Sequence, residues 1–349
     1  MSNSIGLQSV GQLFPKRLTF GRNDRFDVLF IILGALPFYL PIALYLGESG
    51  LSQTVPFDWL FYANQLISMP HVWATYARLN RKISEKKVGA IFGWPAYVAI
   101  LTLLIVATCK GFVLQALTAI NVWQSYHYLR QTYGVSRFFA RPDGETDLER
   151  KLSFWSYHGA MPLLVLGRWN MLFVFWHGKP SDAIIPVSFP TPLMNLLWIV
   201  AGASLLVGLY AELLKYRRST ATYDCSALLT LTVYYAIHWY GFLSIECYFA
   251  GFFCVTVFHA LQYLGIAWKL EDRQRLSNTL QTKILKMVPA SLSFVAFLAG
   301  LYFLGDFIQT HVFGLGDRFW PQFTATCLST ISAHHYLVDT VLWNRKAGV

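Results

Sequence analysis

The chain has 349 residues, of which 55% are hydrophobic, 17% aromatic and only 13% charged. Soluble domains carry about twice this share of charged residues, so the composition excludes an ordinary soluble protein and favours an integral membrane protein. Lys and Arg number 28 against 18 Asp and Glu, which gives a net charge of +10. In a membrane protein such an excess marks cytoplasmic loops, and no nucleic-acid partner is expected.

The chain begins with a polar stretch, residues 1–25, which has no apolar run of the kind found in a secretory signal. We predict a cytoplasmic N-terminal tail here, followed by a single transmembrane helical domain over 26–349. A helix needs about 20 apolar residues to cross a bilayer. Ten segments have roughly this length: 27–47, 57–79, 89–109, 111–134, 153–176, 192–214, 225–242, 244–268, 287–305 and 321–343. The expected fold class is therefore all-α, a polytopic bundle of about ten transmembrane helices.

Basic residues indicate the orientation of these spans. With ten spans, 24 of the 28 Lys and Arg residues fall in the tail, in alternate loops and in the C-terminal segment. Because cationic loops stay in the cytoplasm, both termini are predicted to be cytoplasmic. The connection from Arg141 to Arg150 has mixed charge and is expected to be a solvated loop. The five cysteines show no CxxC spacing and are read as buried thiols.

Nine histidines need an explanation in so apolar a chain, because an ionisable group in hydrocarbon is costly unless it faces a cavity, a partner or a metal. Six of them lie roughly 5–15 Å inward from the predicted cytoplasmic ends of five different spans, at about 1.5 Å per residue. They are His71, His127, His158, His259, His334 and His335. This shared depth predicts a metal centre, since imidazole binds iron, copper and zinc. The alternative is a layer of histidines hydrogen-bonded to tyrosines and amides.

Polar residues beside these histidines are candidates for supporting roles. A ligating imidazole usually gives its second ring proton to a carboxylate, a carbonyl or water. Asp339 follows His335 by four residues and shares its helix face. It is therefore expected to hold a ligand ring, with direct binding of the ion as the alternative. Glutamines near other histidines could orient a ring or a bound water, or could hydrogen-bond between helices: Gln124, Gln131 and Gln262.

Five elements follow one another along the chain: Pro70-His71, His127, His158-Gly159, His259 and His335 with Asp339. Their order resembles that of the bacterial Brp/Blh β-carotene-cleaving dioxygenases, integral membrane proteins thought to hold iron through histidines. The resemblance implies a multi-pass protein of the bacterial inner membrane, with Fe2+ as cofactor and dioxygen as co-substrate. It also implies a hydrophobic substrate, namely a lipid, an isoprenoid or a carotenoid-like molecule.

The sequence departs from the family pattern at Tyr263, at Gln131 and at His334. Tyr263, preceded by Gln262, stands where the family has a second histidine four residues after the first, and Gln131 occupies the place of a carboxylate. The candidate catalytic side chains are Tyr263, Gln262 and Gln131. His334 is additional and is a candidate ligand of the same ion or of a second one.

The sequence thus predicts a membrane-embedded non-haem iron oxygenase in which three or four histidines hold one or two Fe2+ ions. Its partners are a hydrophobic small molecule and membrane lipid. Unless the substrate supplies all four electrons that dioxygen needs, an electron-donor protein is a further partner. Two alternatives stay open: a non-enzymatic haem- or pigment-binding membrane protein, and a transporter that uses the histidines and Asp339 as a relay.

Overall fold

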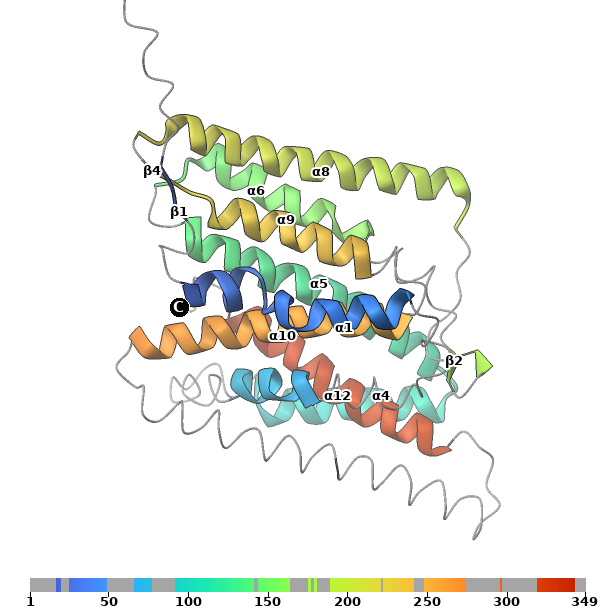
Figure 1. Cartoon of the computed structure of the whole chain (residues 1–349). Coiled ribbons are helices and arrows are strands. Elements are labelled where there is room, and N and C mark those ends of the chain that lie inside the picture. Colours follow the sequence, from blue (N-terminus) through green and yellow to red (C-terminus); the bar gives the residue numbers. More distant parts are fainter. Residues whose placement is uncertain are drawn as a thin grey trace, which may run out of the picture.

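The protein is described by a computed structural model at residues 17–19, 25–48, 66–76, 92–140, 144–163, 175–176, 179–180, 189–220, 222–241, 248–273, 296 and 319–342. Within these residues the chain is mostly helical, which agrees with the predicted all-α class (Figure 1). The helices are η2 (Asp27–Ile32), α1 (Leu36–Glu48), α4 (Trp94–Cys109), α5 (Val113–Ala140), α6 (Asp147–Gly159), α8 (Thr191–Arg218), α9 (Ser226–Trp239), α10 (Tyr248–Arg273) and α12 (Phe319–Leu342), together with helical residues 66–76. Every predicted span except 287–305 overlaps one of them, although α6 covers only the first part of 153–176. The span 287–305 lies outside the described residues apart from residue 296.

The helices lie side by side in one bundle, with α5 and α10 in its interior (Figure 1). α8 forms one edge and packs against α6 and α9, whereas α12 packs against both α5 and α4. The centre is apolar and tightly filled, and side chains such as Leu129, Tyr234 and Phe258 are fully buried there. Burial of this apolar surface holds α5, α9 and α10 together.

The first predicted span, 27–47, is not one continuous helix. It is divided into η2 and α1, because Gly34 and Ala35 adopt left-handed backbone angles, with φ of 51° and 55°. The turn lies directly against α10: a Cβ atom on Gly34 would be 2.6 Å from the Phe258 ring. Glycine tolerates both the positive φ and this close approach. The turn therefore allows both η2 and α1 to pack against α10.

Two small strand pairs accompany the helices, and the all-α prediction did not include them. β1 (Arg17–Thr19) pairs in parallel with β4 (Thr222–Asp224), and β2 (Phe175–Trp176) pairs antiparallel with β3 (Lys179–Pro180). β1 belongs to the stretch predicted to be a tail. Its pairing attaches that part of the chain to the segment between α8 and α9.

The connection before α6 is solvated only in part: Gly144 and Thr146 are exposed as predicted, but the acidic side chains form buried ion pairs that the prediction did not include. The carboxylates of Glu145 and Glu149 are buried and form ion pairs with basic side chains from neighbouring helices. Glu145 contacts Arg137 and lies 2.9 Å from Lys215 Nζ, while Glu149 lies 2.9 Å from Arg218 Nη2. The acidic start of α6 meets the basic end of α8 because these two helices pack along each other.

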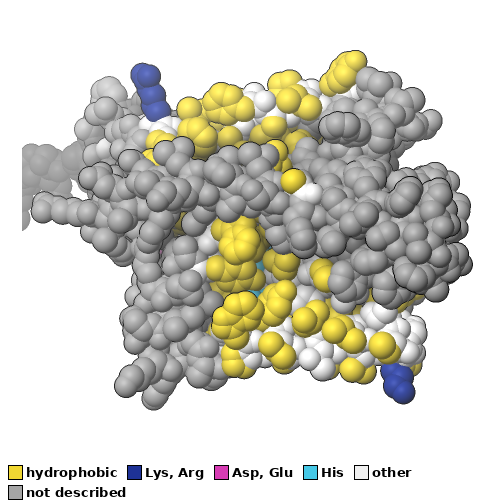
Figure 2. Space-filling view, turned by 90° about the horizontal axis from the view of Figure 1, so that it is seen from below, with side chains coloured by type: hydrophobic (Ala, Val, Ile, Leu, Met, Phe, Trp, Pro, Cys, Tyr) yellow, Lys and Arg dark blue, Asp and Glu magenta, His cyan; other side chains and the backbone are white. Residues whose placement is uncertain are grey.

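One described helix, α8, is long and apolar enough to cross a membrane by length and composition. Its most apolar window is only 11% buried, and large side chains such as Leu196, Ile199 and Leu206 are exposed on it. α4 is also apolar but shorter. Hydrophobic side chains cover much of the described surface on the face seen in Figure 2. The remaining nine spans of the ten-span topology stay a prediction.

Candidate metal centre

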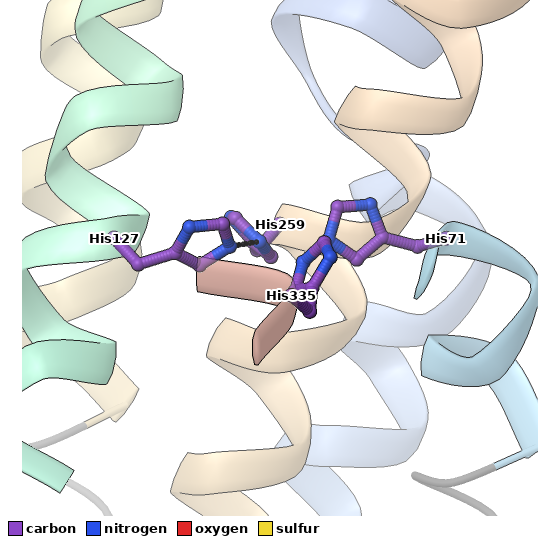
Figure 3. A group of neighbouring side chains, drawn as sticks. All are labelled: His71, His127, His259 and His335. Carbon is purple, nitrogen blue, oxygen red and sulfur yellow. Dashed lines mark hydrogen bonds between the residues drawn. The ribbon is translucent and has the colours of Figure 1, made fainter. Parts of the chain in front are cut away.

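Four histidines from four helices meet inside the bundle (Figure 3). His71 comes from helical residues 66–76, His127 from α5, His259 from α10 and His335 from α12. All four are buried, and their ligand nitrogens lie within 4.8 Å of one another. The imidazoles form two close pairs: His127 Nε2 and His259 Nε2 are 2.9 Å apart, and His71 Nε2 and His335 Nε2 are 2.8 Å apart.

The position of the group along its helices follows from their apolar surroundings. His127 lies thirteen residues before the end of α5, and His259 lies fourteen residues before the end of α10. At 1.5 Å per residue this places the group about 20 Å from those helix ends. Both helices continue past the predicted span ends at residues 134 and 268, from which the two histidines lie about 10 and 14 Å inward, within the expected 5–15 Å. Neighbours such as Leu129 and Phe258 are fully buried in the core.

The chemistry of the group fits a transition-metal ion. It offers four imidazole nitrogens and neither a thiolate nor a carboxylate, and neutral imidazole suits iron, copper, zinc and nickel. A metal–imidazole bond of about 2.1 Å puts ligands on opposite sides of an ion about 4.2 Å apart. Nitrogens that already lie within 4.8 Å of one another need only small movements to close around one ion. Four buried histidines could therefore hold a metal ion.

Asp339 lies beside the group, but its nearest imidazole is not that of His335, the histidine four residues before it. Its Oδ1 accepts a hydrogen bond from Thr75 Oγ1 at 3.1 Å, and its Oδ2 lies 3.8 Å from His127 Nδ1. Asp339 thus faces His127 rather than His335, which shares its helix. The sequence also missed Thr75, although Thr75 follows His71 by four residues and its hydroxyl approaches the His71 carbonyl at 3.3 Å.

The two glutamines beside the histidines tie α5 to α10. Gln131 Nε2 donates to the backbone carbonyl of His259 at 2.8 Å. Gln262 Oε1 accepts from Thr132 Oγ1 at 3.3 Å. Both glutamines are fully buried. Their contacts agree with hydrogen bonding between helices, one of the two roles considered for them.

Three buried tyrosines enclose the imidazoles, with ring centroids 4.3–4.6 Å away: Tyr263 beside His71, Tyr128 beside His259 and Tyr336 beside His127. Tyr128 also explains the position of Gln124, whose Nε2 donates to the Tyr128 hydroxyl at 2.8 Å. Gln124 thus supports a tyrosine of this enclosure. Together the tyrosines give the group an aromatic, largely apolar enclosure.

Two of the six predicted ligands lie outside the group. His158 is half-buried on α6, where its Nδ1 faces the Phe154 carbonyl at 2.8 Å. His334 Nε2 faces the Phe92 carbonyl at 2.9 Å, and its Nδ1 is 3.0 Å from the Tyr76 hydroxyl. α6 packs against α8 at the edge of the bundle, and neighbouring residues on one helix diverge by about 100°. The layer of six histidines is therefore a group of four.

Comparisons with known proteins returned no match. No family model matches the chain, and no curated protein or solved structure matches it. The resemblance to the Brp/Blh enzymes therefore stays a prediction made from motifs.

Proposed function

We propose that the chain is a membrane-embedded oxygenase that uses histidine-bound iron and dioxygen to oxidise a hydrophobic substrate. The observation that carries the proposal is the buried group of His71, His127, His259 and His335, whose ligand nitrogens lie within 4.8 Å of one another. A redox-active ion bound there would supply the binding and reduction of dioxygen. The motif resemblance favours iron over copper or zinc, because all four histidines belong to the matched elements.

The four imidazoles are the residues that would hold the ion. Their two close pairs lie at 2.8 and 2.9 Å, the distance of a hydrogen bond between ring nitrogens, so the pairs would open slightly around a bound ion. An iron ion that accepted more than four ligands would have room for molecules from outside the protein.

The surrounding residues hold the imidazoles and exclude water. Asp339 is placed to fix the His127 ring, and Gln131 holds the His259 backbone. Tyr263 packs edge-on against the His71 ring. Of the candidate catalytic residues, Tyr263 is therefore assigned to the aromatic enclosure of the imidazoles, whereas Gln131 and Gln262 position the ligand-bearing helices.

A hydrophobic substrate is supported by the surface of the bundle. On the face seen in Figure 2, a small part of a histidine side chain is visible between hydrophobic side chains. A hydrophobic molecule could approach a histidine there. We assign the chain to the bacterial inner membrane as a multi-pass protein, with α8 as one span. The basic residues Lys215, Arg218 and Lys269 stand near the ends of α8 and α10 that lie on the left in Figure 1. This arrangement supports a cytoplasmic location for that end of the bundle.

The geometry argues against a haem site. A haem iron takes two axial imidazoles, whose nitrogens lie about 4.2 Å apart on opposite faces of the porphyrin. Here each of the four imidazole nitrogens has another one at 2.8 or 2.9 Å, which leaves no space for a porphyrin plane between the members of either pair. The purified protein is therefore expected to have no strong visible absorption band. A haem-like spectrum would support the pigment-binding alternative.

The first test is metal content. We expect the purified wild-type protein to hold about one iron per chain and His259→Ala and His335→Ala to hold almost none. His158→Leu is the matched control, because it removes a histidine outside the group, and it should retain iron. Near-zero iron in all four proteins would reject the centre.

The second test is oxygen transfer. Iron-loaded protein is given isotopically labelled dioxygen together with either a polyunsaturated isoprenoid or a fatty-acyl lipid, with and without a chemical reductant. We expect label in the product of the wild type and of His158→Leu but not of His259→Ala. Iron-loaded protein that labels neither substrate under either condition would contradict the oxygenase assignment.

A further inference from the structure

His334 takes no part in the four-histidine group, yet its ring is held on every side. Its Nε2 lies 2.9 Å from the Phe92 carbonyl and 3.2 Å from the Gly93 carbonyl. Carbonyl oxygens only accept hydrogen bonds, so Nε2 carries the ring proton and Nδ1 is an acceptor. The Tyr76 hydroxyl, 3.0 Å from Nδ1, is then the donor to it. These bonds use both ring nitrogens and fix one tautomer.

These contacts join three helical elements. His334 belongs to α12, Tyr76 to helical residues 66–76, and Gly93 is the N-cap residue directly before α4. The ring stacks on Tyr76, with centroids 5.4 Å apart, and meets Tyr97 of α4 edge-on at 5.5 Å. Its own exposed fraction is 5%. The buried imidazole therefore links α12 to helical residues 66–76 and to the start of α4.

Two of the three elements that His334 links, helical residues 66–76 and α12, carry two of the four histidines of the metal group. His71 lies five residues before Tyr76, and His335 directly follows His334. The His71–His335 pair is 2.8 Å apart, and the bond from Thr75 to Asp339 crosses the same interface. A slide of α12 along helical residues 66–76 would separate this pair, and the His334 bonds oppose such a slide.

We infer that His334 is a positioning residue that sets the spacing of His71 and His335 and thereby the affinity of the site for its ion. The inference depends on the proposed metal centre but not on the oxygenase reaction. It assigns the two adjacent histidines different roles: His335 binds the ion, and His334 fixes the helix that presents it.

The test is titration of the metal-free protein with Co2+, whose visible absorption reports both affinity and coordination. We expect His334→Leu to weaken binding by about 10–100-fold, the usual effect of losing a residue that supports a metal ligand. His334→Gln should restore most of the affinity, because its carboxamide can donate to the carbonyls and accept from Tyr76. Tyr76→Phe removes the hydroxyl that contacts His334 Nδ1 at 3.0 Å and the Ile331 carbonyl at 3.4 Å but keeps the ring, and it should give a smaller loss. His158→Leu should bind as the wild type does.

Each other outcome has a defined meaning. Unchanged affinity in both His334→Leu and Tyr76→Phe would overturn the inference. Complete loss of Co2+ binding in both His334→Leu and His334→Gln, as in His335→Ala, would overturn it in favour of direct ligation. If His334→Leu does not fold, Tyr76→Phe and His334→Gln decide the matter. Failure of the wild type to bind Co2+ would end this inference together with the metal centre, whereas binding without oxygen transfer would end only the proposed function.

Discussion

Side chains one helical turn from a ligand determine how the imidazoles are held. Asp339 and Thr75 each lie four residues from a histidine on the same helix. The Asp339 carboxylate nevertheless contacts residues of two other elements: it accepts a hydrogen bond from Thr75 of helical residues 66–76 and faces His127 of α5. The i, i+4 spacing identified the helix face of Asp339 correctly. It did not identify the partner, because a partner on another helix depends on how the helices pack.

Substitution of Asp339 tests this placement. We expect Asp339→Asn to lower the affinity for iron by about 10–100-fold, since the carboxylate that faces His127 Nδ1 is lost while the shape of the side chain is kept. His158→Leu is the control, because His158 lies on α6 outside the four-histidine group. Metal titration of the two variants measures the difference. Equal affinities would show that Asp339 does not support the site.

Helix boundaries and breaks belong to the scale of elements. The apolar segments located most helices, but they gave no sign of the division between η2 and α1. Gly34 is an ordinary residue in an apolar run until Phe258 of α10 is placed against it. The ion pairs of Glu145 and Glu149 were likewise hidden, because their partners stand on α5 and α8.

The turn between η2 and α1 should be intolerant of a side chain. We expect Gly34→Ala to lower the free energy of unfolding by about 2 kcal/mol or more, because alanine resists the positive φ and its Cβ would overlap the Phe258 ring. Gly202→Ala is the control: a Cβ there meets nothing within 4 Å, and alanine favours a helix. Thermal unfolding in detergent compares the two. Equal stability would contradict the packing of the turn on α10.

The contact between α6 and α8 should depend on pH. Burial raises the pKa of Glu149, but hydrogen bonds from Arg218 and Thr146 outweigh it, so the pKa lies below its usual value of 4.5. A carboxyl with a lowered pKa stabilises the fold above its unfolded pKa, and this contribution is lost as the pH falls through the folded value. We expect Glu149→Gln to be less stable than the wild type by about 1 kcal/mol at neutral pH, because Arg218 is partly exposed.

Unfolding measured from pH 7 to pH 3 checks this expectation. The gap between the wild type and Glu149→Gln should narrow below about pH 4.5. Lys151→Gln, which changes an exposed charge on the same helix, should show no such trend. A difference in unfolding free energy that stays constant with pH would show that the Glu149–Arg218 ion pair does not stabilise the fold.

At the scale of the whole molecule, composition and histidine placement anticipated a helical bundle with an internal histidine site. Four of the six predicted ligands converge, and His158 does not, because α6 packs at the edge beside α8. Depth along a span could be predicted from the sequence. The direction of each side chain around its helix could not, and it separates the four members of the group from His158 and His334.

The orientation of α8 tests the topology. In bacterial spheroplasts, a membrane-impermeant thiol reagent should label Thr191→Cys above the level of the unmodified protein. Ser219→Cys should react only after permeabilisation, since the end with Lys215 and Arg218 is predicted to be cytoplasmic. Equal labelling of both ends from outside would show that α8 does not cross the membrane.

The central claim is that four imidazoles surround one ion, and X-ray absorption spectroscopy of the iron-loaded protein tests it most directly. We predict four imidazole nitrogens at about 2.1 Å from a single iron, without sulfur and without a second metal nearby, and one fewer imidazole in any form of His335→Ala that retains iron. A spectrum with two or fewer imidazoles, with sulfur ligands or with a metal–metal distance would contradict the account.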